Sequence, residues 1–564
     1  MTVAFLRQIG SESGVQLNPL QDNSEVQVAD NSDQVFAIAM RATRGRIDRP
    51  FKVSAADVFK KLGSGEQIRI NALNLAWVHV VEALNNGAYE AVIHRLVPDT
   101  AIVKYLVCTK NPEFLAETGF AMVGSARVGA SSEYTFDIAE SIPEGDFFFA
   151  LKHLECFNDG IKCSFHADEN DETGENAPND RITLRVLDKD DTLLYEFTGS
   201  LKQGAKDDYG NSAYLPDVIA AQTDLIELTI GVEDGEAEIA VDSDAYGYDE
   251  NGQTKWITSD VMLCFDEGGT TYQTSDYMKA RQALQACEFD YSYISSGGSQ
   301  ATGLLTQLAQ LAYETNTQLR FDVDGALTAD AAIQFVKSLN FGGQKCPHLL
   351  QAFWCPLVSD DPTGVNPPGY FGAATLNIAF ACARNAVKNA KGFARKHYPI
   401  AGREWPINRT RVRQTAQLPS QTLSKLAKAK INPCIYTTYT GGGRYVFYDS
   451  LTCAPVEQSL RKLIAVADMS TTVDDAVTRA SKDYLQLPIT DTIKKLTAYL
   501  DDYFADAQTS GWLVPSDDPA MGGAAYKFVV RANEARPYDA VDVMYWVRYN
   551  GTARQIFVTQ TITK

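Results

Sequence analysis

The feature that most constrains this fold is an alternation of strand and helix patterns between residues 256 and 440. Apolar strand patterns, such as the one at 319–323, alternate with helical patterns, such as the one at 276–289. Thr328 stands where it can cap a further helix that ends at Leu339. This alternation predicts a mostly parallel sheet with helices on both faces. We expect its strands at 261–265, 291–295, 319–323 and 348–358.

A related pattern occupies residues 34–97. An apolar strand at 35–40 leads through the turn-prone basic stretch 44–50 to Ser54, which can cap a helix over 55–62. Gly63 ends that helix. A second helix and a strand at 89–96 follow, and the helix is marked by apolar residues at helical spacing: Leu73, Trp77, Val80, Val81 and Leu84.

Residues 98–255 read as all-β and interrupt the α/β pattern. Alternating strands at 182–187 and 193–197 flank a turn, and another strand follows at 225–230. This spacing predicts an inserted barrel or sandwich. The loop at 168–180 carries six acidic residues and no basic one, so we expect it to face water.

The section 441–564 is predicted to hold two helices and a terminal hairpin. A helix over 490–504 would share one apolar face among Ile493, Leu496, Leu500 and Phe504. Asn550-Gly551 is a strong hairpin signal, which predicts that a strand at 541–549 pairs with one at 552–563. Gly441-Gly442-Gly443 lacks the Lys-Ser/Thr of a phosphate-binding loop, and we interpret it as a hairpin turn.

At the other end, residues 1–30 form a polar arm with one extended apolar patch at 3–9. A lone strand is not stable in water, so this patch either pairs with another segment or stays disordered.

Composition excludes several classes of function. At 564 residues the chain should divide into about three or four domains. A net charge of −20 argues against nucleic-acid binding. No apolar run reaches the roughly 18 residues of a membrane helix, and residues 1–7 lack a signal peptide. We therefore expect assembly in the host cytoplasm, with no membrane partner.

The residues offer little catalytic or metal chemistry. No Gly-x-Ser-x-Gly elbow occurs, and Ser295 and Ser299 have only His348 and His397 as possible bases in their region. We predict no enzymatic activity and no cofactor. The acidic loops at 168–175 and 242–247 lack the terminal Glu of an EF-hand, so solvated loops are preferred over a bound cation. The ten cysteines include no C-x-x-C pair, and the nearest cluster matches no zinc spacing: Cys346, His348 and Cys355.

A basic stretch between residues 384 and 413 stands out in so acidic a chain. Nucleic-acid binding is one interpretation. We prefer pairing with acidic loops of a neighbouring subunit, which would fix register more than add affinity. The residues expected at such a contact are Arg395, Lys396, Arg409, Arg411 and Arg413.

The order of elements in 34–97 resembles the N-terminal core of contractile bacteriophage tail sheath proteins. The resemblance rests on a Gly…Pro…Ser connection after the first strand, an Asn-Gly stop, and a final strand that carries Arg95. Further likenesses lie at 195–197, 214–219, 374–402 and 423–434. The resemblance spans nearly the whole chain.

This resemblance implies a multidomain α/β and β protein. Its parts would be an N-terminal arm (1–30), the N-terminal part of the core (31–97), an outward-facing inserted β-barrel or sandwich (98–255), a subtilisin-like α/β domain without protease activity (256–440), and an α+β C-terminal domain facing the tube (441–564). Homo-hexameric rings would stack helically around a tail tube protein, with baseplate and tail terminator proteins as further partners. They would contract on host contact and drive the tube through the envelope, in the virion tail.

The chain ends are expected to exchange strands between subunits. The residues concerned are Val3, Phe5, Ile9, Ile556, Val558 and Ile562. Lys494 and Lys495 are predicted to face the tube. The first alternative is a sheath subunit of a tailocin or secretion-type injection machine. From other classes, the alternatives are a secreted subtilisin-like hydrolase and a cation-binding β-sandwich surface protein.

Overall fold

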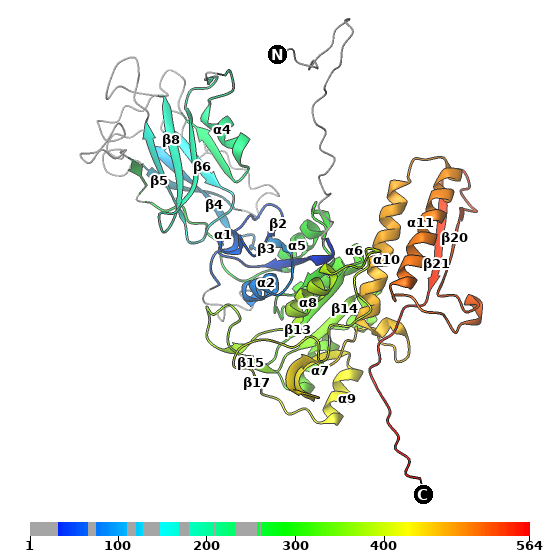
Figure 1. The fold of residues 1–564 in the computed structure, drawn as a ribbon. Helices are drawn as coiled ribbons and strands as arrows, with labels where there is room; N and C mark the ends of the chain where they lie inside the picture. Colours follow the sequence, from blue (N-terminus) through cyan, green and yellow to red (C-terminus); the bar gives the residue numbers. More distant parts are fainter. Residues whose placement is uncertain are drawn as a thin grey trace, which may run out of the picture.

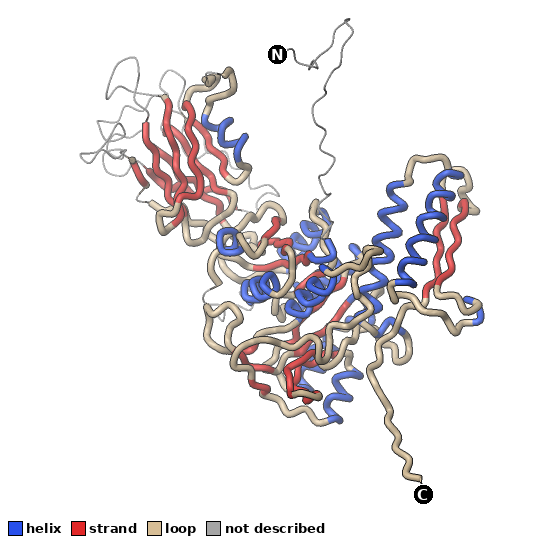
Figure 2. The backbone as a smooth tube through the Cα atoms, viewed as in Figure 1, coloured by secondary structure: helices blue, strands red, loops and turns tan. Residues whose placement is uncertain are grey.

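The computed structural model describes residues 32–65, 75–109, 120–127, 147–167, 180–207, 209–231, 256–259 and 261–563. Figure 1 shows a central sheet flanked by helices, with a β sandwich on one side and a C-terminal part on the other. Figure 2 shows that strands dominate the sandwich, whereas long helices dominate the C-terminal part. The chain is a mixed α/β protein with several sheets, as predicted.

The central sheet has eight strands in the order β19-β18-β14-β13-β12-β1-β3-β2. The six inner strands run parallel, and β2 and β19 pair antiparallel at the edges. The predicted parallel sheet is therefore confirmed, and it draws strands from both sides of the β region. Their bounds are β1 Val35–Met40, β2 Phe51–Val53, β3 Glu90–Arg95, β12 Tyr293–Ser295, β13 Gln318–Val323, β14 Leu350–Trp354, β18 Ile431–Tyr439 and β19 Gly442–Phe447.

Helices cover both faces of this sheet because its inner strands are buried on both sides. On one face, Trp77 of α2 and Ile378 of α8 share a buried cluster with Phe36 of β1. On the other face, α5, α6, α7 and α9 pack, and Thr328 caps α7 as predicted. The helix bounds are α1 Val58–Leu62, α2 Leu75–Asn85, α5 Thr274–Ala286, α6 Thr302–Thr315, α7 Ala329–Leu339, α8 Ala374–Ala386 and α9 Ser420–Lys428.

Three local predictions about this core are wrong. Ser54 caps no helix at residue 55, because its N–H and hydroxyl both donate to Asp57 Oδ1 and α1 starts only after Asp57. The segment 261–265 is not a strand of the central sheet, since Leu263 bridges Ile161 in the sandwich. The strand expected over 348–358 is interrupted, and its parts are η7 Pro347–Leu349, β14 and β15 Leu357–Ser359.

Short elements connect these layers. β15 forms a small antiparallel sheet with β16 Gly369–Tyr370 and β17 Arg413–Gln414. The hairpin interpretation of 441–443 is confirmed, because β18 and β19 pair antiparallel around this turn. Four single-turn helices complete the connections: η1 Ser32–Gln34, η6 Phe341–Gly343, η8 Leu460–Lys462 and η9 Pro519–Met521.

The β region is a sandwich of two four-stranded sheets, in the orders β10-β6-β4-β5 and β11-β7-β8-β9. Their facing sides share one buried cluster, in which Phe149 meets the edge of Phe165 at 5.7 Å between ring centroids. α4 (Leu215–Gln222) packs its Leu215 and Ile219 into the same cluster. The strand bounds are β4 Ile102–Thr109, β5 Phe120–Arg127, β6 Phe147–His153, β7 Ile161–Ala167, β8 Arg181–Asp188, β9 Leu193–Ser200, β10 Ile226–Ile230 and β11 Ile257–Thr258.

The C-terminal part pairs two long helices with a small sheet. These are α10 (Ile464–Asp483), α11 (Ile489–Thr509), and the antiparallel strands β20 (Tyr526–Ala532) and β21 (Val541–Val547). The apolar face predicted for α11 is buried at Leu496, Leu500 and Phe504 and half-buried at Ile493. The hairpin predicted at Asn550-Gly551 is wrong, because β21 has already paired with β20.

Candidate functional site

The most unusual surface of the described chain is the extended segment 552–563, called the C-terminal tail here. Figure 1 shows it running away from the body of the molecule. Its start is fixed, because the Asn550 N–H donates to Trp512 O at 2.8 Å and the Arg554 guanidinium pairs with Asp449 at 2.8 Å. Beyond this anchor the tail exposes large apolar side chains to solvent: Ile556 82%, Phe557 89%, Val558 88% and Ile562 88%.

The sheet of β20 and β21 offers an edge that such a segment could join. One face of this sheet packs on α11, where Phe504 contacts the rings of Tyr526, Phe528 and Tyr545. Within the described ranges, β20 and β21 pair only with each other, so each leaves one edge unpaired. Unpaired edges present backbone N–H and C=O groups that template a further strand.

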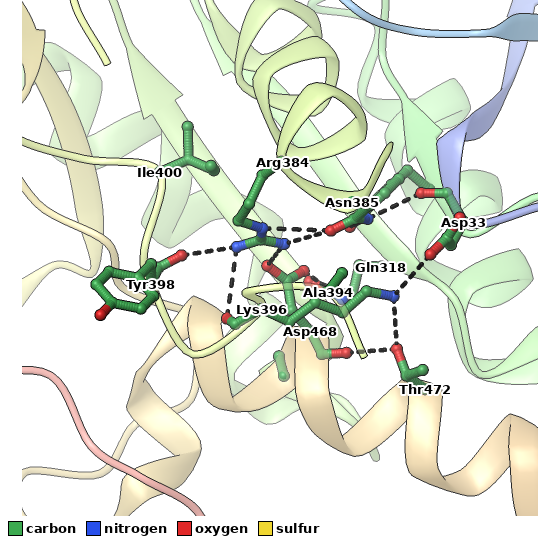
Figure 3. A network of polar contacts seen from close by, with 12 residues as sticks. Asp33, Gln318, Arg384, Asn385, Ala394, Lys396, Tyr398, Ile400, Asp468 and Thr472 are labelled. Atoms are coloured by element: carbon green, nitrogen blue, oxygen red, sulfur yellow. Dashed lines mark hydrogen bonds and ion pairs between the residues drawn. The ribbon is translucent and has the colours of Figure 1, made fainter. Parts of the chain in front are cut away.

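A buried charged junction joins the C-terminal part to the core (Figure 3). The Asp468 carboxylate of α10 forms an ion pair with Arg384 of α8 at 2.8 Å. It forms a second one with Arg320 of β13 at 3.0 Å. These three side chains are at most 3% exposed. Burial opposes the ionisation of Asp468, but the charges of Arg384 and Arg320 outweigh it and lower the pKa of this carboxyl. The junction is therefore a paired ionic contact that is buried from the protein surface.

The junction extends to the first described residues. Lys396 is buried beside it, and its Nζ donates to Thr472 Oγ1 of α10 at 2.9 Å and lies 3.8 Å from Asp33 Oδ2 of η1. Asn385 Nδ2 donates to the Asp33 carbonyl at 2.8 Å. The first described residues, at Asp33, are thus tied to α8 directly and to α10 through Lys396 (Figure 3). A cavity of about 630 Å³ opens beside these groups.

A second polar seam joins the core to the sandwich. Arg95 at the end of β3 is fully buried, and it donates to Gly45 O at 2.7 Å, Cys156 O at 2.6 Å and Asn158 Oδ1 at 2.7 Å. Arginines that follow β1 add further ion pairs across the seam: Arg41–Glu267, Arg44–Asp159 and Arg46–Asp224. The sequence predicted only a turn at residues 44–50. In the structure, arginines of this turn also hold the core and the sandwich together by ion pairs.

The predicted contact residues outside the C-terminal tail fall into three groups. Val3, Phe5 and Ile9, like the loops at 168–175 and 242–247, lie outside the described residues. Five of them are exposed on the surface: Lys494, Lys495, Arg395, Arg411 and Arg413. Two positions are corrected, because their side chains are only 3% exposed and pair within the chain: Lys396 and Arg409.

Arg409 pairs with Glu82 of α2 at 2.6 Å and donates to the carbonyls of Phe371 and Gly372. It fastens the 360–410 segment to the core and cannot reach a neighbouring subunit in this conformation.

The candidate catalytic residues have structural partners. Ser295 Oγ lies 2.7 Å from Thr375 Oγ1, and Ser299 Oγ accepts from the Ala301 N–H. His348 Nδ1 contacts Arg461 at 3.4 Å, and the ring of His397 lies against Tyr398. In the part of the chain that the structure describes, neither serine is hydrogen-bonded to a histidine, so these residues form no triad there.

The described residues contain neither a metal cluster nor a membrane-spanning helix. Over these residues no three His, Cys, Asp or Glu side chains come together as a metal site. None of the helices described combines the length and hydrophobicity that a membrane span needs. All ten cysteines are free thiols.

Comparisons with known proteins found structural likenesses only. No protein-family model matches this sequence, and no curated protein does. The fold is similar to the sheath tail protein of Desulfitobacterium hafniense, at 13% identity and a TM-score of 0.47 over 96% of this chain and 100% of that one. It is also similar to the sheath complex of an extracellular contractile injection system in the contracted state (12% identity, TM-score 0.40, 55% and 76% covered) and to the anti-feeding prophage baseplate (12%, 0.38, 54% and 77%).

These similar structures come from the class of assembly that the sequence resembles. All three TM-scores lie below 0.5, so the likenesses establish neither a family nor a function for this chain.

Proposed function

We propose that this chain is the structural subunit of a contractile phage tail sheath. The observation that carries the proposal is the C-terminal tail, whose apolar side chains are exposed in a molecule that also has a sheet with unpaired edges, β20–β21. Burying one such side chain is worth about 1.5–3 kcal/mol, so four exposed in one segment favour a bound partner. The tail is anchored at Arg554 and extends into solvent beyond it. In this conformation its apolar side chains cannot be buried against the subunit they belong to.

The partner is a second copy of this chain. The tail of one subunit adds a strand to the β20–β21 sheet of a neighbour, and the arm with Val3, Phe5 and Ile9 completes the same sheet. Main-chain hydrogen bonds then give a link that survives rotation of the subunits. Repetition of this link produces stacked hexameric rings around a tail tube, capped by baseplate and tail terminator proteins in the virion tail.

The remaining surfaces receive roles consistent with this arrangement. The α/β core corresponds to the subtilisin-like sheath domain, and the sandwich faces outward. Lys494 and Lys495 of α11 meet the tube through screened charge contacts, which are weak enough to release during contraction. Register between subunits is set by the exposed members of the basic stretch, which are Arg395, Arg411 and Arg413.

Two alternatives remain on the same fold. A sheath subunit of a tailocin or secretion-type injection machine would use the same strand exchange, and the cargo inside the tube distinguishes it. A subtilisin-like hydrolase requires a serine beside a base, and the partners of Ser295 and His348 oppose that arrangement.

The test is a face-specific charge substitution in the tail. Ile556→Asp with Val558→Asp places two charges on the face expected to be buried, and Thr559→Asp with Thr561→Asp places them on the opposite face. The first variant should remain a folded monomer without cylinders in negative-stain images, whereas the matched control should polymerise. Deleting residues 1–12 or 552–564 should likewise give folded monomers. Normal cylinders from the first variant would contradict strand exchange.

A further inference from the structure

Two cysteines lie opposite each other on neighbouring parallel strands: Cys355 directly follows β14, and Cys434 lies within β18. β14 and β18 pair with Phe353 opposite Asn432 and Trp354 opposite Pro433. The next residues in this register are Cys355 and Cys434. Neighbouring strands lie about 4.7–4.9 Å apart, and the Cα atoms of a disulfide lie about 4.4–6.8 Å apart. The backbone spacing of this pair therefore suits a disulfide.

The two side chains also point the same way. Phe353, Cys355 and Cys434 all belong to the buried cluster on the α2 and α8 face, whereas Trp354 belongs to the cluster on the other face. This alternation is what a strand requires of successive residues. The thiols lie close enough together for each to change the pKa of the other. Neighbouring thiols on the same face of two paired strands need little movement to bond.

The electrostatic surroundings differ for the two thiols. The neighbouring Cys434 thiol lowers the pKa of Cys355 against the effect of burial, and the nearby Arg409 guanidinium adds to this lowering. Burial, together with the neighbouring Cys355, raises the pKa of Cys434. The thiol with the lower pKa is the better nucleophile in disulfide exchange.

A small cavity lies beside Arg409, whose guanidinium acts on Cys355. Arg409 lines a cavity of about 140 Å³ together with Glu82, Asp361 and Asn408. The cysteines themselves are at most 1% exposed. Exchange therefore needs a local opening of the structure around them.

We propose that Cys355 and Cys434 form a redox pair that closes an intrachain disulfide when it meets a low-molecular-weight disulfide such as oxidised glutathione. The Cys355 thiolate attacks one glutathione sulfur, which breaks the glutathione S–S bond and releases one glutathione thiolate. Cys434 then gives its proton to solvent, and its sulfur attacks Cys355, releasing the second glutathione. Two protein thiols are oxidised and one small disulfide is reduced to two thiols.

This bond would fasten the segment that covers one face of the core. The closed loop contains α8, which carries Arg384 of the charged junction, together with β15, β16, β17 and α9. A reducing cytosol keeps the pair as thiols, and a particle outside the cell would be oxidised. The chemistry depends on the geometry of the subunit alone, and only this timing rests on the proposed function.

The test counts thiols in the purified full-length monomer. The protein is equilibrated with reduced and oxidised glutathione at several ratios, quenched with acid, alkylated with N-ethylmaleimide after denaturation, and weighed intact. We expect ten adducts under reducing conditions and eight under oxidising ones, with peptide mapping that links Cys434 to Cys355. Dithiothreitol should restore ten, and the oxidised form should melt at a higher temperature.

Variants separate this pair from the other buried thiols. Cys355→Ser and Cys434→Ser should each keep nine adducts under oxidising conditions, whereas the matched control Cys382→Ser, in the same buried cluster, should fall from nine to seven. The series is repeated in urea just below the unfolding transition, so that access does not limit the exchange. Ten adducts in both series, a stable glutathione adduct on Cys355, or linkage of other cysteines would each overturn the proposal. None of these readouts needs a polymer, so a failure here is distinct from a failure of the sheath proposal.

Discussion

The charged junction gives a sharp prediction about how the C-terminal part is held. In Asp468→Asn the amide keeps the size of the side chain but loses its charge, while Arg320 and Arg384 stay 0% and 3% exposed. Removing one partner of a buried ion pair costs about 3–5 kcal/mol, because it leaves an uncompensated charge. We therefore expect Asp468→Asn to lose about 3–5 kcal/mol of unfolding free energy.

The same helix supplies a matched control. Asp475 also pairs with an arginine, Arg479, but its side chain is 58% exposed. Exposed pairs contribute about 0–1 kcal/mol, so Asp475→Asn should change stability by less than ~1 kcal/mol. Urea unfolding followed by two probes gives the free energies, and hydrogen exchange of the α10 amides shows whether the loss is local.

The pH dependence provides an independent check with a defined sign. The pKa of Asp468 is lowered in the folded chain, so its stabilising effect is complete above its unfolded pKa of about 3.9 and is lost as pH falls through the folded value. The gap between wild type and Asp468→Asn should therefore be constant from pH 5 to 7 and shrink below pH 4. If Asp468→Asn proves as stable as Asp475→Asn at neutral pH, the reasoning about this junction is wrong.

Three further predictions concern other parts of the molecule. Reversing Lys494 and Lys495 to Glu should leave the monomer's melting temperature unchanged but abolish co-sedimentation with tail tubes in low salt, and unchanged co-sedimentation would contradict the tube-facing role. Ser295→Ala should produce no loss of any hydrolytic signal on peptide or ester substrates, because wild type and variant should both be inactive. Burial lowers the pKa of His79 to about 3 and that of His94 to about 4, so the unfolded chain binds protons first as pH falls below about 6.5. Stability should therefore decrease from pH 6.5 to 4, by up to ~1.4 kcal/mol per pH unit for each histidine, and replacing either by Gln should flatten that decrease in pH-dependent urea melts.

Much of the core could be predicted because the spacing of apolar residues in each segment matches the face that the segment buries. The strand β13 and the helix α7 with its Thr328 cap lie where the sequence places them. The sequence around Asn550-Gly551 could not show that its hairpin fails. The strand β21 pairs instead with β20, which lies upstream, and both strands pack on α11. Ser54 is not a cap for a local reason: its N–H and hydroxyl both donate to the Asp57 carboxylate, and α1 begins only after Asp57.

The polar junctions were the least predictable features. The basic stretch suggested a surface, yet Lys396 and Arg409 point inward because acidic partners from distant segments meet them there. One signal was present in the sequence: Asp468 stands inside the apolar run 464–469, where an unpaired carboxylate would be costly. That signal indicates a buried partner without saying which one, since Arg320 and Arg384 lie more than 80 residues away.

The position of β1 in the central sheet has a consequence for the order of synthesis. Phe36 of β1 needs Tyr293 of β12 as a neighbour, so at roughly 5–20 residues per second the ribosome delivers that neighbour about 13–50 s later. The sandwich is encoded in the interval and can fold while β1 and β3 wait. β18 and β19 then close the sheet, and the C-terminal tail emerges only after them. The C-terminal tail, which we propose adds a strand to a neighbouring copy, is thus translated after the body that would receive it.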